Sequence, residues 1–600
     1  MKLAKYIAGF SLLIGLSSCF DLDKNPEGVL STTTAFTSSA EIEKYLNQFY
    51  ESGLRGQSNN VGAASGIAFG DMNSDNMISN VIDTRLAGEL ALSNSSKLGN
   101  YTQIRNVNFL INNLGNCKET GEAFKQCVGE AYFFRAWYYY QMFIQYGPIS
   151  WVSVVLDPVQ EQMRIPRHDR TVVADSILAD LDKAIEFLNV QNSSATMRVH
   201  RDVACALKSE VALFEGTWEK YHKEKGTPFY DKNITDQKIN NYLQQAADAA
   251  KQVIDRGVWS ISGGDPLTAY RDLFITLDLS ANKEVLWWKK YSTDDNIGHS
   301  VTRYLNKGGG ITGASMSLVD DYLTADGRPY VGEERATAQK VYGEELQPDV
   351  RDPRLSQTVC LPGQELRPNK GYTFMLPPLD GNSYHQNTTG FSVLKYVEFN
   401  TTNQATIDGE GKSQAPAIQF RYADILLNYA EALAELDGAG NAAKIAEALN
   451  PLRSRVGMPG VDFDREYNTD ASYPFRSLNK YIQAVRRERR VEKALEGRRL
   501  EDILRWAAAD ILIKGQTPKG ALFVGSNLKG AYSTLVYDQP SGNNLYLSGK
   551  PGDERRYIIP FNNTSYANGW NFNLDRDYLL PIQPRMISLT DGMWTQNPGW

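Results

Sequence analysis

Residues 421–436 read RYADILLNYAEALAEL, and this stretch decides the fold. Its larger apolar side chains recur at i, i+3, i+4, i+7, i+8 and i+11, which is the spacing of one face of an amphipathic helix: Tyr422, Ile425, Leu426, Tyr429, Ala430 and Leu433. Small alanine side chains between them let neighbouring helices approach closely. The stretch therefore predicts a helix that packs tightly against other helices.

Other segments extend this pattern along the chain. Glu130–Tyr146 is apolar on nearly all sides, which predicts a helix buried between neighbours and ended by Gly147-Pro148. Further helices are predicted over residues 40–50, 171–188, 201–221, 240–256 and 477–506, the last with a break at Gly497. Several of these helices pair across turns, as in tetratricopeptide-like hairpins, although no exact repeat of about 34 residues is present. The predicted fold class is all-α, with tetratricopeptide-like helical hairpins forming a superhelical scaffold.

Two regions interrupt the helical pattern. Residues 260–417 are rich in Gly and Pro and lack helical periodicity, and residues 511–600 are also loop-rich. Long irregular stretches in a helical protein are usually functional or poorly ordered, and short strands such as Glu284–Lys289 are expected within them. We therefore expect one domain over residues 35–600. Its scaffold is expected at 35–259 and 418–510, and its variable ligand-binding insert at 260–417.

The chain begins with an export signal. Lys2 and Lys5 precede an apolar run, Ala8–Leu16, and then Leu16-Ser17-Ser18-Cys19. This order is typical of a secretory signal peptide, here residues 1–18. An apolar core of about nine residues is too short for a membrane span, which needs about twenty. Residues 19–34 are polar and contain Pro and Gly, so they are interpreted as a tether. The net charge of −7 argues against a nucleic-acid partner.

Four cysteines follow Cys19, and two of them are close in sequence. An exported chain can form disulfides, and a bridge between Cys117 and Cys127 would close a short loop before a helix. Two free, buried thiols are the alternative. No Cys-x-x-Cys is present, so the sequence does not predict a zinc ribbon or a redox motif.

Five segments in a fixed order resemble the SusD/RagB family of outer-membrane nutrient-binding lipoproteins. They are the signal ending at Cys19 with Asp21-Leu22-Asp23 after it, the segment 131–149, the segment 420–432, the arginine-rich segment 486–506, and the terminal Gln596-Asn597-Pro598-Gly599-Trp600. The resemblance implies a lipidated (palmitate-bearing) Cys19 and a location on the outside of the outer membrane. It also implies a glycan-binding surface and a partner, a SusC-like transporter driven by TonB. Some RagB-like members serve peptide import, so a peptide-binding surface lipoprotein is the alternative function.

Two of these segments have structural interpretations. The arginines between Arg486 and Arg505 alternate with acidic residues, and Glu501 and Arg505 stand at i, i+4. Mixed charge of this kind indicates an ion-pair network rather than an anion site. Gln596 and Trp600 are likewise expected to be packed structural elements.

The sequence contains no catalytic signature. Gly-x-Ser-x-Gly, the phosphate-binding Gly-x-x-x-x-Gly-Lys and His-Glu-x-x-His are all missing, and the five histidines lack ligand spacing. We therefore predict no enzyme activity, no cofactor and no metal. A pair of glycosidase carboxylates cannot be judged from sequence, because carboxylates are plentiful.

Candidate binding residues come from the insert and from one polar loop. Flat aromatic rings suit the apolar face of a sugar, and their polar tips suit its hydroxyl groups. The aromatic candidates lie in the irregular insert: Trp287, Trp288, Tyr291, Tyr304 and Tyr372. Strand alternation sends Trp287 and Trp288 to opposite faces, so at most one is expected to bind ligand. In the family that it resembles, the polar loop with Asp71, Asn73 and Asp75 often borders the ligand site; the alternative is an Asx-turn cluster that caps a helix.

Overall fold

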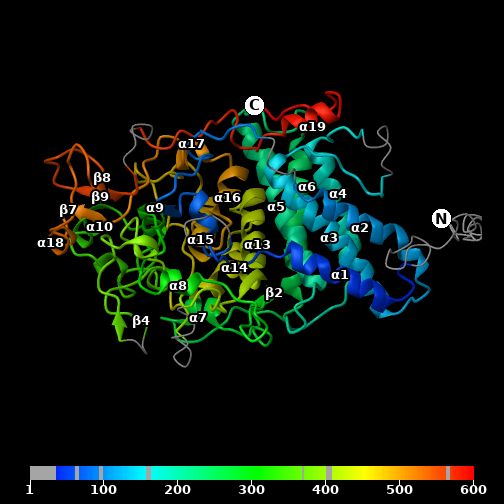
Figure 1. Cartoon of the computed structure of the whole chain (residues 1–600), viewed down its shortest axis with the longest axis horizontal. Coiled ribbons are helices and arrows are strands. Elements are labelled where there is room, and N and C mark those ends of the chain that lie inside the picture. Colours follow the sequence, from blue (N-terminus) through cyan, green and yellow to red (C-terminus); the bar gives the residue numbers. More distant parts are fainter. Residues whose placement is uncertain are drawn as a thin grey trace, which may run out of the picture.

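The computed structural model describes residues 35–60, 66–93, 99–156, 164–367, 371–399, 409–561 and 568–600 (Figure 1). The signal peptide, Cys19 and the whole predicted tether lie outside the described residues. Within these ranges, no helix combines the length and the apolar character that a membrane span requires.

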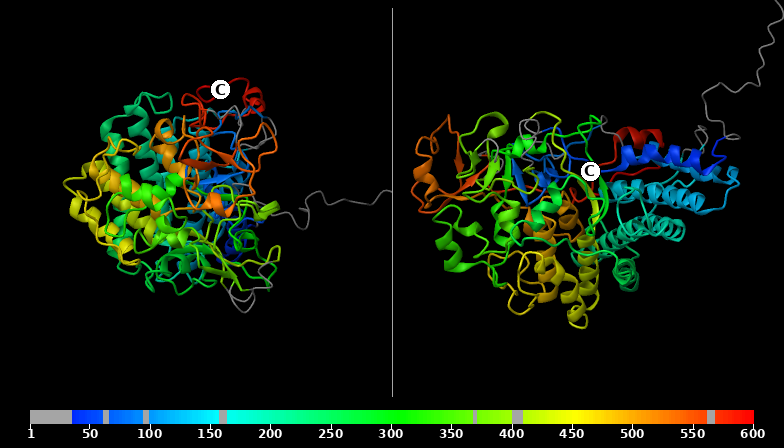
Figure 2. Two further views of the ribbon diagram at one scale, coloured as in Figure 1. Left: turned by 90° about the vertical axis from the view of Figure 1, so that its left-hand side faces the viewer. Right: turned by 90° about the horizontal axis from the view of Figure 1, so that it is seen from below.

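A helical array forms one side of the molecule, and short strands and loops form the other (Figures 1 and 2). Its first helices are α1 (Ser39–Gly53), α2 (Tyr101–Asn113), α3 (Glu122–Tyr146), α4 (Arg170–Phe187), α5 (Arg201–Glu224) and α6 (Asp236–Asp255). From α2 onward, each helix packs against the next. The array continues through α13 (Tyr422–Asp437), α14 (Ala442–Ser454), α15 (Lys480–Glu492) and α16 (Arg499–Arg505). The predicted all-α, tetratricopeptide-like fold is confirmed.

Residues 422–436 lie in α13, as predicted, and Arg421 is the N-cap of this helix. Asp424 Oδ2 accepts the backbone N–H of Arg421 at 2.8 Å, which caps the helix start. Its apolar face lies against α5 and α6, although the whole insert separates these helices in the sequence. The predicted break at Gly497 is also confirmed, because α15 ends at Glu492 and α16 begins at Arg499.

The insert holds more helix than the sequence predicts. Its short helices are α7 (Ala269–Ile275), α8 (Val301–Leu305), α9 (Met316–Asp321), α10 (Gly332–Ala338) and α11 (Arg354–Thr358). The C-terminal part adds α17 (Ala509–Leu512), α18 (Leu528–Ala531) and α19 (Pro584–Leu589). Single 3-10 turns are η1 (Gly70–Asn73), η2 (Leu114–Asn116), η3 (Glu344–Leu346) and η5 (Ser383–His385).

Among the described residues there are four small antiparallel sheets, and two of them connect segments that are distant in the sequence. β1 (Met77–Ser79) pairs with β3 (Thr312–Ala314), and β2 (Val285–Lys289) with β6 (Ala417–Arg421). β4 (Glu365–Arg367) pairs with β5 (Tyr372–Thr373), and β9 (Arg556–Ile559) lies between β7 (Leu522–Val524) and β8 (Tyr546–Leu547). The β2–β6 pair thus joins the two ends of the insert where it leaves and re-enters the helical array.

Strand β2 separates two hydrophobic cores. Trp287 belongs to the core of the helical array, where it meets the ring of Trp137 edge to face at 5.6 Å. Trp288 belongs to the core of the insert. The predicted alternation is therefore confirmed, and both faces of the strand are covered.

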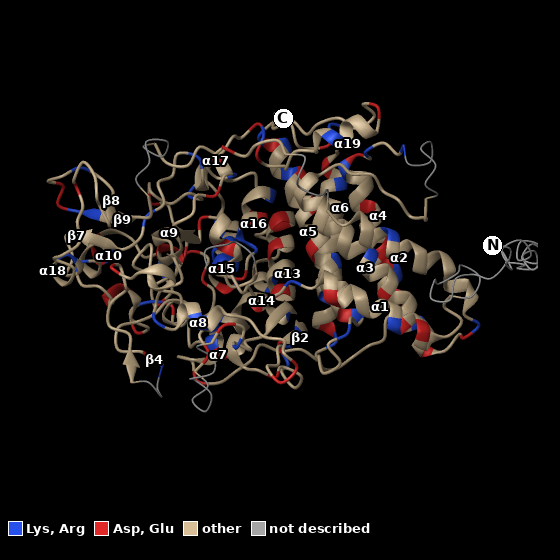
Figure 3. Cartoon of the chain, in the orientation of Figure 1, with Lys and Arg blue, Asp and Glu red and all other residues tan. Residues whose placement is uncertain are grey.

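Helix α15 carries a buried network of ion pairs, as its alternating charges predicted (Figure 3). Glu492 Oε1 accepts from Arg421 Nη1 at 2.6 Å, and Glu492 Oε2 accepts from Arg455 Nη2 at 2.6 Å and from Arg354 Nη1 at 2.9 Å. Arg421 also reaches Glu284 and Glu496. The network joins α15 to the insert and to the start of α13.

The C-terminal residues pack against the end of α3, as predicted. Gln596 bonds both backbone groups of Ile582, and the Asn597 amide donates to the carbonyls of Tyr146 and Leu580. Trp600 donates its indole N–H to Leu579 at 3.1 Å.

The predicted bridge between Cys117 and Cys127 does not form in the structure. Both are free, buried thiols, and Cys127 Sγ donates instead to the backbone carbonyl of Ser39. The alternative, that these cysteines fill the core, is the one that the structure supports.

Candidate functional site

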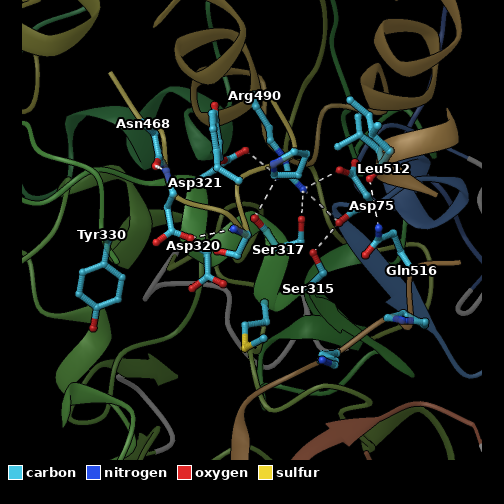
Figure 4. Close-up of a pocket in the computed structure, with 18 of the residues that line it drawn as sticks. Asp75, Ser315, Ser317, Asp320, Asp321, Tyr330, Asn468, Arg490, Leu512 and Gln516 are labelled. Carbon is cyan, nitrogen blue, oxygen red and sulfur yellow. Dashed lines mark hydrogen bonds and ion pairs between the residues drawn. The ribbon is translucent and has the colours of Figure 1, made fainter. Parts of the chain in front are cut away.

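A large cavity lies where the insert, α15 and the loop after α17 meet (Figure 4). Its volume is about 590 Å³. Four separate parts of the chain supply most of its wall: residues 74–78, 315–335, 468–490 and 511–519. Tyr557 and Trp570 complete it. A pocket of this size is in the range of small-molecule sites.

Arg490 of α15 organises one side of the cavity. Its Nη2 donates to Asp75 Oδ2 at 2.9 Å, its Nη1 to Asp321 Oδ2 at 2.5 Å, and its Nε to Asn76 Oδ1 at 2.9 Å. Ser317 Oγ also accepts from it, and Figure 4 shows Asp75, Asp321 and Ser317 pointing toward the guanidinium. Burial raises the pKa of Asp75, but Arg490 and Arg499 more than offset this effect, so its pKa lies below the usual range.

A second pair of an arginine and an aspartate also lines the cavity. Arg335 of α10 donates from Nε and Nη2 to the two carboxylate oxygens of Asp320, at 2.7 and 2.8 Å. Two-point pairing of this kind fixes both side chains in one geometry. Both residues line the cavity, and each remains about one quarter exposed.

Further hydrogen-bonding and aromatic side chains complete the cavity wall beside these two groups of paired arginines and aspartates. Ser315, Ser317, Asn468, Ser472 and Gln516 line the cavity. Four aromatic rings do so as well: Tyr330, Tyr473, Tyr557 and Trp570. Tyr330 is held in place by Arg351, whose guanidinium carbon lies 3.6 Å from the ring centroid. The cavity wall therefore combines fixed polar groups with rings of which Tyr330, Tyr473 and Trp570 are largely buried and Tyr557 is half-buried.

The three candidate residues of the polar loop lie in different places: one has a structural role, and the other two line two separate cavities. Asp71 is fully buried and accepts the backbone N–H groups of Leu495 and Arg499, so it joins the loop to the start of α16. Asp75 lines the large cavity. Asn73 lines a different cavity of about 430 Å³, formed by residues 55–59 and by glycines such as Gly497.

Trp287 and Trp288 are wrong as ligand-binding candidates. They are 0% and 1% exposed, and their indole N–H groups donate to the carbonyls of Met197 and Ser194. Each ring is enclosed by one of the two cores, so a ligand cannot reach either face.

The other aromatic candidates also lie outside the large cavity. Tyr291 and Tyr304 are buried, and both form hydrogen bonds with the backbone of the segment after α1. Tyr291 Oη accepts from Gln57 N at 2.6 Å, and Tyr304 Oη donates to Asn59 O at 2.7 Å. Tyr372 is half-buried in β5 and donates to Lys307 O at 3.2 Å. Of all the predicted ligand-binding residues, only Asp75 is brought to this cavity.

Sequence analysis missed most of the cavity wall. Asp320, Tyr330 and Arg335 come from α9, α10 and the loop between them, where no periodicity drew attention to them. Arg490 was assigned to the ion-pair network, and it does belong there while also facing the cavity. The adjacent acidic pair Asp320-Asp321 in an irregular segment was the one signal available.

The arrangement offers recognition rather than an evident reaction centre. Within the described part of the chain, no group of three or more His, Cys, Asp and Glu side chains is placed to hold a metal ion. The carboxylates Asp75, Asp320 and Asp321 are each paired with an arginine.

The fold places the protein among tetratricopeptide-like helical proteins with a large irregular insert. Residues 283–600 match the model of the SusD family, and residues 21–213 match a model described as starch-binding, associating with the outer membrane. Because the first match covers more than half of the chain, the protein belongs to the SusD family.

Several known proteins are similar to it along their whole length. "SusD-like protein P2" of Formosa agariphila is 20% identical over 611 residues, which is 98% of each chain. A SusD-like protein of Bacteroides fragilis has a TM-score of 0.67 at 21% identity, covering 94% of this chain and 98% of that one. A SusD-like carbohydrate binding protein of the same organism has a TM-score of 0.67 at 20% identity, covering 94% and 99%. A laminarin binding SusD-like protein has a TM-score of 0.53 at 18% identity, with the same coverage. At these identities, the solved structures establish the fold.

Proposed function

We propose that this protein binds an oligosaccharide or polysaccharide in the large cavity and delivers it to a TonB-dependent, SusC-like transporter of the outer membrane. The observation that carries this proposal is the cavity itself, where fixed hydrogen-bonding groups stand beside aromatic rings in a member of the SusD family. Sugars present many hydroxyl groups around an apolar ring, so they fit a wall of this composition.

The cavity favours binding without catalysis. Retaining and inverting glycosidases need one carboxylic acid with a raised pKa and a second carboxylate opposite it. Here Asp320 is held by Arg335, and Arg490 contributes to keeping the pKa of Asp75 low. An arginine beside a carboxylate favours the ionised form, which cannot act as a general acid.

The remaining parts of the proposal concern location and partner. Lipidation at Cys19, surface exposure and transfer to the transporter are supported by the lipoprotein-type signal and by membership of the family. Cys19→Ala should release the protein from the membrane fraction. Recovery of the transporter at about equal stoichiometry from mild detergent would support the partnership, and recovery of this protein alone would contradict it.

Binding is tested with a panel of glycans and a mixed peptide pool. We expect micromolar affinity, about −8 kcal/mol, that rises with oligosaccharide length. Ser472 is exposed and lines the cavity, so Ser472→Trp should occupy the space and abolish binding. Ser588 is equally exposed on α19 outside the cavity, so Ser588→Trp is the matched control. Retention of peptides but not glycans would favour the peptide-import function instead.

A further inference from the structure

The charged side chains of the large cavity are balanced in number. Four carboxylates line it: Asp75, Asp320, Asp321 and Asp470. Four cationic side chains also line it: Arg335, Arg487, Arg490 and Lys519. The balance matters because a cavity that selects an anionic ligand needs cations in excess, or cations whose donors are free.

Arg490 has no donor left for a ligand. Its Nε, Nη1 and Nη2 groups all donate to acceptors of the protein, among them Asp75, Asp321 and the backbone carbonyl of Ser317. Arg490 as a whole is only 4% exposed. An anion could bind it only by displacing a carboxylate, which would then remain in the cavity without its partner.

Arg487 and Arg335 are also engaged. Arg487 is buried, donates to the carbonyl of Glu466 at 3.0 Å, and has that residue's carboxylate 3.9 Å away. Its Nη2 finds no acceptor among the described residues, but this atom is shielded from the cavity space. Arg335 uses two of its five N–H donors on Asp320, and its Nη2 also contacts Met316 Sδ at 3.4 Å.

One cation and one carboxylate remain outside these pairs. Lys519 lies beside the ring of Tyr557, with Nζ 5.7 Å from the centroid. Asp470 accepts from the backbone N–H and the hydroxyl of Ser472. Lys519 and Asp470 carry opposite charges. A single half-exposed lysine adds little to the free energy of binding an anionic ligand when salt is present.

We infer that the occupant of the large cavity is an uncharged glycan. This inference rests on the proposed function and adds the chemical class of the ligand. A uronate or sulfate group placed against Arg490 or Arg335 would have to compete with the carboxylate already bound there, and displacing Asp75 or Asp321 from Arg490 would leave a buried charge uncompensated, which is strongly unfavourable. Hydroxyl groups can instead use the second lone pairs of the paired carboxylates and the free side chains of the cavity.

The test compares neutral polysaccharides with charged forms of the same chains. The probes are laminarin and soluble starch, each also in carboxymethylated and sulfated form, together with galactomannan, polygalacturonate and alginate. We expect at least one neutral member to bind, with an affinity that changes less than about twofold between about 50 and 500 mM NaCl. Its charged form should bind at least tenfold more weakly.

A single substitution should reverse this preference. Asp320→Asn removes the carboxylate from Arg335 and leaves the guanidinium facing the cavity. This variant should bind the carboxymethylated chain at least tenfold more tightly than the wild type does, and the gain should disappear at high salt. Asp326→Asn is the control, because Asp326 pairs with Arg328 outside the cavity.

The outcomes are distinguishable. Binding confined to polygalacturonate, alginate or the sulfated chains, with strong salt dependence in the wild type, would overturn the inference while leaving glycan binding intact. An absence of binding to every glycan would overturn the proposed function and the inference together. An unchanged preference in Asp320→Asn would also contradict the charge-balance argument.

Discussion

Gly70 and Gly497 touch: a Cβ atom built on Gly70 would lie 2.6 Å from the Cα of Gly497. Gly497 has a φ of +70° at the junction of α15 and α16, and the Arg55 guanidinium donates to its carbonyl and to that of Glu496. The contact brings the loop that carries Asp75 onto the arginine-rich segment. Two glycines more than 400 positions apart are thus needed for one wall of the cavity.

Gly70→Ala should therefore destabilise the protein by about 2 kcal/mol or more, because the backbone that meets the new methyl group cannot yield easily. Gly497→Ala should cost at least as much, since it adds strain at positive φ. Thermal unfolding measures both. Gly115→Ala is the control, because nothing lies within 4 Å of its Cβ position; equal losses in all three variants would contradict the close packing.

Trp287→Ala should unfold the protein more easily without acting on ligand directly. Removal of a fully buried large aromatic side chain costs about 3–5 kcal/mol. Chemical denaturation measures this loss. Where the variant still folds, its glycan affinity at low temperature should match the wild type; a selective loss of affinity with unchanged stability would show that the core assignment is wrong.

The Glu492 carboxylate should make stability depend on acid pH. Burial opposes its ionisation, but Arg455, Arg421 and Arg354 hold its pKa well below the usual range. A depressed folded-state pKa contributes stability above the unfolded value of about 4.3, and that stability is lost as pH falls further. The melting temperature should therefore drop between about pH 5 and pH 3.

Glu492→Gln tests the source of this dependence. It should cost about 3–5 kcal/mol at pH 7, because the arginines lose a buried partner, and its acid-induced drop should be smaller than that of the wild type. Glu122→Gln is the control, since the Glu122–Lys125 pair is largely exposed. Parallel pH curves for wild type and Glu492→Gln would assign the acid sensitivity to other groups.

The four cysteines after Cys19 should all react as free thiols once the protein is unfolded without reductant. In the folded protein they should be inert, because each is buried and burial raises the pKa of Cys127 and Cys205 to about 12. Thiol labelling of a chain that begins at residue 20 counts them. Labelling of two thiols instead of four would show that Cys117 and Cys127 are joined by a disulfide.

Periodicity made the scaffold predictable, because each long helix buries a stripe that repeats along the chain. Residues 421–436 and 130–146 were identified in this way, and Gly497 marked the break before α16. The short helices of the insert escaped notice, since a helix of five to seven residues such as α8 or α10 is too short to show a period.

The cavity could not be predicted for a different reason. Its wall combines Asp75, Asp320, Asn468 and Gln516, which come from four distant segments, and no local pattern joins them. Alternation correctly sent Trp287 and Trp288 to opposite faces of β2 but could not reveal that each face is covered by a core. Aromatic content alone therefore predicted ligand contacts for rings that are packed inside the cores.

The pairing of β2 with β6 has a consequence for how relatives diverge. Lys289 and Ala417, which enclose most of the insert, are direct partners in the sheet. Because its ends meet, the intervening chain can lengthen, shorten or be exchanged during evolution without moving α6 away from α13. Insertions and deletions that alter ligand preference should therefore accumulate between residues 290 and 416, in step with compensating changes in the loop that contains Asn468 and the one that contains Gln516.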